Sequence, residues 1–378
     1  MTVHGHVDER FSALSEVLDA QLASGEELGA AVSVNLGGQT LVDVWGGYAD
    51  AARTIPWGED TIVNVWSTTK EITALAILML VEQGLVDLDA PVATYWPEFA
   101  QHGKHDILVK QVMSHTSGVS GWDQPFVAED MYDWEKSTSR LAAQAPWWEP
   151  GTASGYHAQN QGHLLGEIVR RVSGLPLKQF VAERIAAPLG VDLQIGAKAE
   201  DDDRVAEIIP PPPLGFDLAT MDPTSPTVRT LTGPVSDAAL ANTIPWRRAD
   251  MGALNGHTNA RALARTFSTI SLGGEVDGAR LLSPATIERI FEEQSHGPDL
   301  VLGVPLRFGI GFALPEPTSI PYVPSEKVCF WGGWGGSMTL MFPDRGLTVS
   351  YVMNRMAPGI IGSDRAELYL TSILSALD

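Results

Sequence analysis

The chain has 378 residues, of which 44% are hydrophobic and 19% are charged, so it can bury a large apolar core. It carries 25 basic and 46 acidic residues, which gives a formal net charge of −21. Neutralising nucleic-acid phosphates requires clustered Lys and Arg, and a field of this sign repels polyanions. The composition therefore argues against nucleic-acid binding and against attachment to anionic membranes.

Cysteine occurs once, at Cys329, so neither an intramolecular disulfide nor a cysteine-based metal cage can form. His102 and His105 have no ligand cluster around them in the sequence, and we expect no metal and no cofactor. The first ten residues lack the basic and apolar regions of a signal peptide. The longest apolar run, residues 72–81, is much shorter than the ~20 residues that span a bilayer. These features predict a cytoplasmic protein without membrane insertion.

The first 45 residues predict a helix followed by a β-hairpin. Residues 10–23 place apolar side chains on one helical face, and Gly25 follows as a stop. Residues 30–36 and 40–45 are rich in β-branched side chains and are separated by Gly37-Gly38, which indicates a hairpin. Two strands alone are marginally stable in water, so this hairpin needs partner strands elsewhere in the chain.

The middle of the chain is typical of helices linked by loops. Helices are predicted over residues 68–83, 161–173, 177–187 and 259–271, each followed by Gly or Pro. The acidic run 200–203 is typical of a solvated turn, and Pro210–Pro213 predicts a stiff loop.

The C-terminal part supplies the missing strands. Short strand-like runs cover residues 327–331, 337–342 and 347–353, and a helix is expected over residues 364–377. The two ends then form one antiparallel sheet flanked by terminal helices, an α+β fold with a mainly helical insertion. We expect a discontinuous sheet domain of residues 1–66 and 255–378, a helical domain of residues 67–254, and an active site at their junction.

The tetrapeptide Ser67-Thr68-Thr69-Lys70 lies where the apolar segment 62–66 meets the longest predicted helix. Ser67 and Lys70 are one helical turn apart, so hydroxyl and amine are within reach of each other. A serine becomes a nucleophile when a base takes its proton, and burial and a helix N-terminus both lower the pKa of a lysine toward that task. Alone, the tetrapeptide is more typical of a helix cap followed by a surface lysine.

Several further segments in the same order make this sequence similar to the serine β-lactamase and penicillin-binding-protein superfamily, and within it to the family VIII carboxylesterases. Besides the tetrapeptide, these segments are Val42–Gly47, Met113–Gly118, Pro150-Gly151-Thr152 before Tyr156, and Trp331-Gly332-Gly333 before Trp334. The resemblance spans nearly the whole chain. It implies a serine β-lactamase-like fold and an acyl-enzyme formed on Ser67.

The second catalytic box of this superfamily, Tyr-x-Asn, corresponds to Tyr156-His157-Ala158. The resemblance assigns the Tyr156 phenol as a proton shuttle that works with Lys70, and a cationic lysine beside a phenol is expected to lower its pKa. Ala158 lacks the amide that contacts the acylamino group of β-lactams. His157 is expected either to line the substrate pocket or to be packed structurally, and His115 is expected to be structural.

The third box, Lys-Thr-Gly in β-lactamases, reads Trp331-Gly332-Gly333 in this chain. The resemblance assigns the backbone N–H of Trp334 to an oxyanion hole, together with that of Ser67. Trp331, Gly332 and Gly333 are expected to line the substrate pocket. Trp331 stands where a cation would bind the carboxylate of a β-lactam.

These residues predict a serine carboxylesterase that hydrolyses small-molecule esters with short acyl chains. In this interpretation Ser67 attacks, Lys70 and Tyr156 move the proton, and water releases the acid. Two alternatives stay open. One is a β-lactamase, D-amino-acid peptidase or acyltransferase with the same nucleophile, and the other is a catalytically silent module that binds a small ligand in the same cleft.

Overall fold

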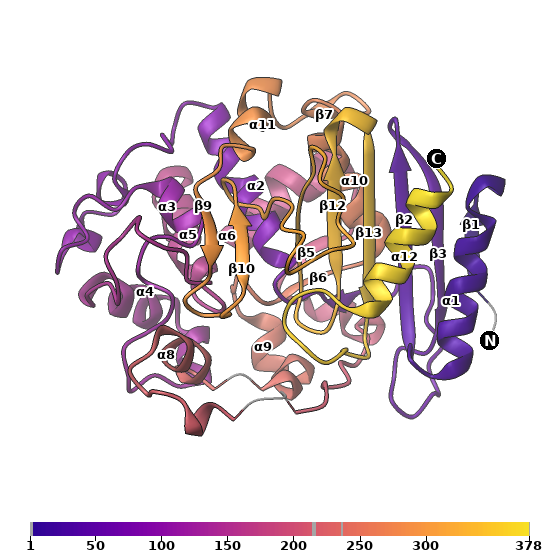
Figure 1. Ribbon diagram of the computed structural model, residues 1–378, viewed down its shortest axis with the longest axis horizontal. Helices are drawn as coiled ribbons and strands as arrows, with labels where there is room; N and C mark the ends of the chain where they lie inside the picture. Colours follow the sequence, from indigo (N-terminus) through magenta and orange to yellow (C-terminus); the bar gives the residue numbers. More distant parts are fainter. Residues whose placement is uncertain (1–2, 214–216, 236, 378) are drawn as a thin grey trace.

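A six-stranded antiparallel sheet joins the two ends of the chain in the computed structural model, which describes residues 3–213, 217–235 and 237–377 (Figure 1). In spatial order its strands are β1 (His4–Val7), β3 (Gln39–Gly47), β2 (Gly29–Leu36), β13 (Leu347–Met353), β12 (Met338–Phe342) and β11 (Cys329–Gly332). The central pair is β2 with β13, so the N-terminal hairpin finds its partner more than 300 residues away, with Ala30 opposite Met353 and Leu36 opposite Leu347. The predicted α+β fold with one sheet built from both ends is confirmed.

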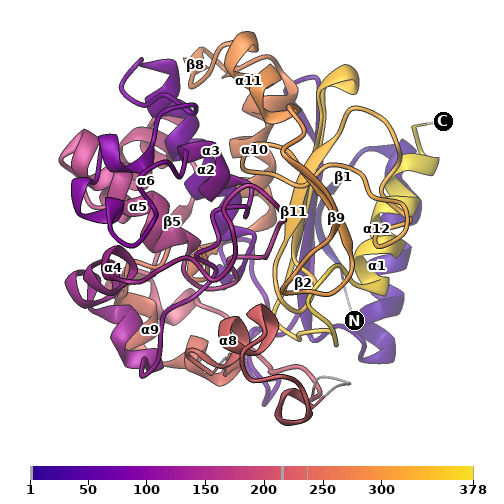
Figure 2. The same ribbon diagram turned by 60° about the vertical axis from the view of Figure 1, so that its left-hand side comes forward.

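The sheet is covered on both faces. Helices α1 (Ser12–Ser24) and α12 (Asp364–Ser375) pack together on the outer face, and α10 (Ala260–Ser271) packs against β2, β12 and β13 on the inner face (Figures 1 and 2). Helix α1 buries Leu14, Leu18 and Leu22, which recur every four residues, and it ends at Gly25 in the left-handed conformation, as the sequence predicts.

The hairpin β2–β3 turns at Gly37 and Gly38, whose φ angles are 59° and 87°. Two consecutive positive φ angles match the twist of the flanking strands, and glycine adopts them without strain. Strand β1 is not predicted by the sequence analysis. Its residues are mostly exposed at the sheet edge, so they lack the apolar alternation that reveals a strand.

The remaining strands form three small sheets. One contains β4 (Val63–Asn64), β6 (Gly256–Thr258) and β5 (Leu193–Ile195), another pairs β9 (Ser295–Pro298) with β10 (Pro305–Phe308), and the last pairs β7 (Glu275–Val276) with β8 (Ala279–Arg280). The first of these sheets takes strands from both of the domains expected from the sequence. The domain boundaries remain a prediction.

The helical half surrounds α2 (Thr69–Glu82), which is buried from Thr69 to Leu80 because α5 (Gln161–Ser173) and β11 pack against it. The predicted helix over residues 177–187 is α6 (Leu177–Val181), one turn of π-helix, η5 (Ala182–Ala186), and α7 (Ala187–Leu189). The other α-helices of this half are α3 (Val109–Met113), α4 (Trp134–Ala143), α8 (Pro226–Thr232) and α9 (Ile244–Arg248), and α11 (Pro284–Ile290) follows in the C-terminal part of the chain. In the described part of the chain, no helix combines the length and apolarity needed to cross a bilayer.

A buried ion pair ties the terminal helices to the sheet. Arg365 of α12 lies 2.6 Å from a carboxylate oxygen of Glu27, and the side chains are 6% and 0% exposed. The hydroxyls of Tyr351 and Tyr369 donate to the other oxygen of Glu27, at 2.5 and 3.2 Å. Arg365 also donates to the carbonyls of Glu26 and Arg355. This cluster fixes α12 against the loop that follows α1.

Replacing Arg365 is expected to destabilise the fold strongly. Arg365→Ala leaves the Glu27 carboxylate buried without its cation, and breaking such a pair costs about 3–5 kcal/mol in the free energy of unfolding. Urea denaturation at pH 8 measures this loss. The matched control is Arg307→Ala, whose partner Glu293 is 46% exposed, and such a surface pair is worth at most about 1 kcal/mol. Equal losses in the two variants would contradict the role assigned to the buried cluster.

Candidate active site

Ser67 lies in the turn that leads into α2, and Lys70 lies in the first turn of that helix. The Nζ atom of Lys70 is 2.9 Å from Oγ of Ser67, 2.8 Å from the carbonyl oxygen of Ala158 and 3.0 Å from that of Ala253. Lys70 is only 2% exposed. Burial lowers the pKa of Lys70 well below its usual range because the charged amine loses its hydration. The helix-cap alternative does not describe this pair, since the lysine is inside the protein.

Lys70 Nζ has three oxygen partners. The carbonyls of Ala158 and Ala253 can only accept, so each takes an N–H bond. The third partner is Ser67 Oγ, to which Nζ donates when it is charged and presents its lone pair when it is neutral. The arrangement therefore provides a base next to a hydroxyl.

Tyr156 lies beside this pair and is 1% exposed. Its ring centroid is 4.8 Å from Nζ of Lys70, and its hydroxyl accepts a hydrogen bond of 2.9 Å from the indole N–H of Trp331. Burial raises the pKa of Tyr156, against the opposing effect of hydrogen bonds with Ser67 and Trp331. The expectation that a cationic lysine lowers this pKa is wrong, because desolvation dominates at both groups. It favours a neutral Lys70 and a protonated Tyr156.

His157 does not line a substrate pocket, so that expectation is also wrong and the structural alternative holds. The side chain is fully buried, with Nδ1 2.7 Å from the carbonyl of Gly155 and Nε2 2.6 Å from the hydroxyl of Ser117. Burial lowers its pKa to about 3. The predicted structural role of His115 is confirmed, because its Nδ1 accepts the backbone N–H of His157 at 3.1 Å.

The Trp331-Gly332-Gly333 segment packs against Tyr156 and against the residues before Ser67. It is not part of the lining of the cavity formed by the described residues. Trp331 is 6% exposed, and its indole N–H donates a hydrogen bond to the hydroxyl of Tyr156. A Cβ atom on Gly333 would lie 2.3 Å from the carbonyl oxygen of Val65 and 2.3 Å from Oγ of Ser337. Only glycine lets this turn approach the segment before Ser67 so closely. Trp331 and Gly333 are buried and Gly332 is partly exposed, and the expectation that these three residues line the substrate pocket stays a prediction.

A cavity of about 530 Å³ opens next to Ser67. Ser67, Tyr156, Ala158 and Trp334 all contribute to its lining, so four of the residues singled out in the sequence meet at one place. Trp334 packs edge-on against Trp66 with ring centroids 5.2 Å apart. In the described part of the wall, Asp237 is the single charged side chain, and it is exposed.

Most of the cavity wall was missed by the sequence analysis. It consists largely of apolar residues: Trp66, Met131, Pro210–Pro213, Leu218, Leu231, Val235, Leu240, Trp246, Leu254 and Ile360. The proline run 210–213 predicts only a stiff loop. The sequence after it has no hydrophobic periodicity that would identify it as part of a cavity wall. Trp66 adopts a positive φ of 48°, which is rare for a bulky residue and is often found at functional sites.

Within the described residues, no group of three His, Cys, Asp or Glu side chains is placed to hold a metal ion. The chemistry available at the site is thus that of a serine hydroxyl, a buried amine and a phenol.

The antiparallel sheet with both terminal helices on one face, and the cluster of Ser67 and Lys70 at the start of α2 with Tyr156 beside it, together define a serine β-lactamase-like protein. A family model described as Beta-lactamase matches residues 14–370, and the chain belongs to this family.

Similar proteins include esterases. A crystal structure of a family VIII carboxylesterase superposes with a TM-score of 0.93 at 36% identity, covering 100% of both chains. A penicillin-binding-protein homologue from Caulobacter crescentus gives a TM-score of 0.91, also at 36% identity and with 100% of both chains covered. The esterase/β-lactamase LipL of Mycobacterium tuberculosis is 34% identical over 375 residues, covering 96% of this chain and 86% of LipL. The resemblance to family VIII carboxylesterases is confirmed.

Proposed function

We propose that this chain is a serine carboxylesterase that hydrolyses small-molecule esters through an acyl-enzyme on Ser67. The observation that carries the proposal is the buried Lys70 amine, which donates to two carbonyls and lies 2.9 Å from Ser67 Oγ. The esterases among its relatives support a carboxylic ester hydrolase of the serine β-lactamase-like type.

Acylation begins when Lys70 takes the proton of Ser67 and Oγ attacks the ester carbonyl. The negative charge that develops on the carbonyl oxygen is stabilised by the backbone N–H groups of Ser67 and Trp334, whose residues line the same cavity. Each such donor is worth about 3 kcal/mol of the barrier. This step leaves a tetrahedral oxyanion and a lysine ammonium.

Collapse of this intermediate requires a proton for the leaving alkoxide. The Tyr156 phenol is protonated and adjacent to both Ser67 and Lys70, so it donates its proton to the alkoxide and regains one from the Lys70 ammonium. The alcohol leaves and the acyl group stays on Oγ. A water molecule then attacks this acyl-enzyme, with its proton taken by Lys70, and the Lys70 ammonium returns that proton to Ser67 Oγ as the acid departs.

The cavity wall favours neutral esters over β-lactams. A penicillin or cephalosporin carries a carboxylate, and the described wall offers it no cation but instead the exposed Asp237. Ala158 provides a backbone carbonyl to Lys70 and no side-chain amide to a substrate. A neutral ester with an apolar acyl or alcohol group fits these surroundings better.

Initial rates of the unaltered protein test this function. We expect saturable hydrolysis of p-nitrophenyl acetate, butyrate and octanoate, with nitrocefin turned over far more slowly. Comparable kcat/KM for nitrocefin would favour the β-lactamase alternative. If no ester is hydrolysed and a fluorophosphonate probe leaves Ser67 unlabelled, the protein is a silent binding module.

A substitution at Gly333 is expected to impair the chemistry without touching a reacting group. The Cβ atom of Gly333→Ala would collide with the Val65 carbonyl, so the turn must move and take Trp334 with it. A displacement of about 1 Å of the oxyanion donor lowers kcat on the order of 100-fold. The matched control is Gly58→Ala, because the nearest atom to a Cβ there is 3.8 Å away. Unchanged kcat in Gly333→Ala would argue against the role of the Trp334 N–H.

A further inference from the structure

A second cavity, of about 540 Å³, lies away from Ser67 between the α6–η5–α7 segment, β5 and the end of α9. Four cationic side chains contribute to its wall, Lys178, Lys198, Arg247 and Arg248, against a single carboxylate, Asp192. In a chain with a net charge of −21, such a concentration of positive charge is unusual. The cavity also includes residues of the π-helical turn η5, and such turns are frequent at functional sites.

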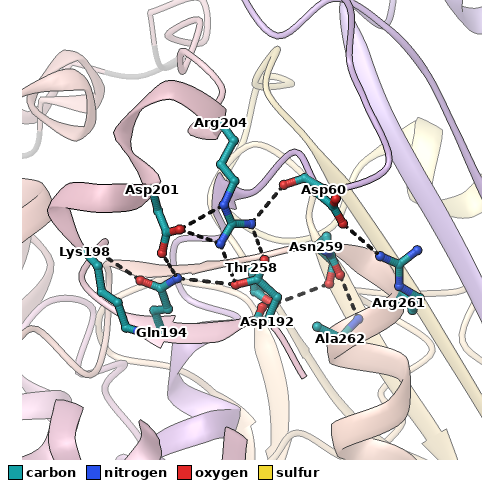
Figure 3. Close-up of polar contacts among 10 residues, drawn as sticks. All are labelled: Asp60, Asp192, Gln194, Lys198, Asp201, Arg204, Thr258, Asn259, Arg261 and Ala262. Carbon is teal, nitrogen blue, oxygen red and sulfur yellow. Dashed lines mark hydrogen bonds and ion pairs between the residues drawn. The ribbon is translucent and has the colours of Figure 1, made fainter. Parts of the chain in front are cut away.

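Three carboxylates around this cavity have arginine partners. Figure 3 shows Arg204 between Asp192 and Asp201, with its Nη2 atom 3.1 Å from Oδ1 of Asp192 and 2.8 Å from Oδ1 of Asp201. Gln194 donates to Asp201 as well. Asp202 accepts from Arg248 with one oxygen, while its Oδ1 and Oδ1 of Asp250 are buried without a hydrogen-bond partner in the described part of the structure. Two arginines thus offset part of the charge of these carboxylates, and one of them, Arg248, also lines the cavity.

Arg247 is left with its donors unfilled. Its side chain is 12% exposed, and the nearest carboxylate oxygen, on Asp202, is 3.8 Å away, beyond hydrogen-bond distance. Its Nε atom is buried and has no hydrogen-bond partner in the described part of the structure. A guanidinium has five N–H donors in a planar fork, and burying them unsatisfied is costly. Oδ1 of Asp202 is also without a hydrogen-bond partner, so a ligand in the cavity would compete with this oxygen for the guanidinium of Arg247.

Lys178 and Lys198 also line this cavity, and carboxylates offset little of their charge. Lys178 Nζ is 3.3 Å from the carbonyl oxygen of Arg248, and its backbone N–H donates to Asp250. Lys198 is exposed, and its backbone N–H is used by Gln194. Among the described residues, neither lysine forms an ion pair within 4.0 Å, although Asp250 and Asp201 lie close enough to interact with them electrostatically.

We infer that this second cavity binds an anionic small molecule, whose carboxylate or phosphate group is held by Arg247 together with Lys178 and Lys198. The planar guanidinium suits a bidentate contact with either group, and the lysines add charge at the rim. Ala182, Ala186 and Val191 leave room for a small apolar body beside the anion. The site is separate from the proposed catalytic cavity, although α9 borders both, with Trp246 in one wall and Arg247 in the other.

Isothermal titration calorimetry of the full chain with inorganic phosphate and with butyrate tests this inference. We expect saturable binding of at least one of the two anions, weaker at high ionic strength, and no binding of butan-1-ol at the same concentrations. Phosphate binding alone would indicate a phosphorylated ligand, and butyrate binding would indicate a carboxylate. If neither anion gives a saturable heat of binding, the inference is wrong.

Variants locate the binding within the protein. Arg247→Gln and Lys198→Gln are each expected to raise the Kd of the anion by about 10-fold or more, since each removes a charge-assisted hydrogen bond. The matched control, Arg280→Gln, removes an exposed charge that is paired with Glu275 and is expected to leave binding unchanged. Lys198 is exposed, so its variant keeps the test valid if Arg247→Gln does not fold. Equal affinity in all three variants and the unaltered protein would place the anion elsewhere and refute the site.

Discussion

Ser67→Ala is expected to lower kcat for p-nitrophenyl butyrate by about 10⁴-fold or more, because removal of a nucleophile abolishes the covalent pathway. The remaining rate would come from the oxyanion donors and from substrate binding, which the substitution leaves in place. The measurement is a comparison of initial rates at saturating ester, with circular dichroism to establish that the variant is folded.

The control for this variant is Ser33→Ala. Ser33 is also a fully buried serine, and its hydroxyl donates to the carbonyl of Val42 in the sheet, so its loss changes stability without touching the cavity. We expect full activity from this control, and fluorophosphonate labelling of Ser33→Ala but not of Ser67→Ala. Equal ester hydrolysis by Ser67→Ala and the unaltered protein would show that Ser67 is only part of a helix start.

Lys70→Met is expected to lower kcat/KM for the same ester by about 10³-fold, the range that a positioned general base contributes. The unaltered protein should lose activity as the pH falls through the lowered pKa of Lys70, because the ammonium form has no lone pair to accept the Ser67 proton. This acidic limb should disappear in Lys70→Met. Full pH–rate profiles of the two proteins measure both effects, and a retained limb would assign it to another group.

Stability gives a second test of the Lys70 pKa. In the unfolded chain Lys70 binds a proton up to its ordinary pKa of 10.5, whereas in the folded protein burial releases that proton at lower pH. Between these two pH values the unfolded state binds more protons, so stability rises with pH. The free energy of unfolding of the unaltered protein, relative to Lys70→Met, should therefore increase as the pH rises toward 10.5.

Lys104→Met is the matched control for both measurements. Lys104 is another buried lysine held by backbone carbonyls, at 3.0 Å from Gln101 and 3.1 Å from Ala142, and burial lowers its pKa to about 8. It does not line the catalytic cavity. We expect this variant to keep its kcat/KM and the acidic limb. A loss of activity equal to that of Lys70→Met would trace the effect to general destabilisation.

Local patterns in the sequence predicted the framework well. The spacing of Leu14, Leu18 and Leu22 predicted α1, and the glycines at 37 and 38 predicted the hairpin turn, since each depends on neighbours a few residues away. Strand β1 was missed because an exposed edge strand has no apolar pattern. The π-helical turn η5 was missed as well, because composition does not distinguish it from an α-helix.

The candidate site, like the fold, was only partly predictable from the sequence. Ser67 and Lys70 could be paired from sequence because one helical turn separates them, and Tyr156 was found through its family motif. The hydrogen bonds of Trp331 to Tyr156 and of His157 to Ser117 could not be predicted, because which side of a residue faces a cavity depends on packing between distant segments. The apolar wall around Leu231 and Trp246 carries no local signal at all.

The sequence by itself determined the helices, the central strands and the family, and it predicted the three side chains of the proposed mechanism, because these are encoded in short periodicities and in motifs of fixed spacing. Tertiary structure alone decided the ionisation of the site. Whether Lys70 is neutral and Tyr156 protonated depends on how much water each has lost, and that loss is imposed by residues far away in the chain, such as Ala253 and Trp331. The extent of desolvation depends on the residues packed around a group, so it cannot be predicted from the tetrapeptide that carries the nucleophile.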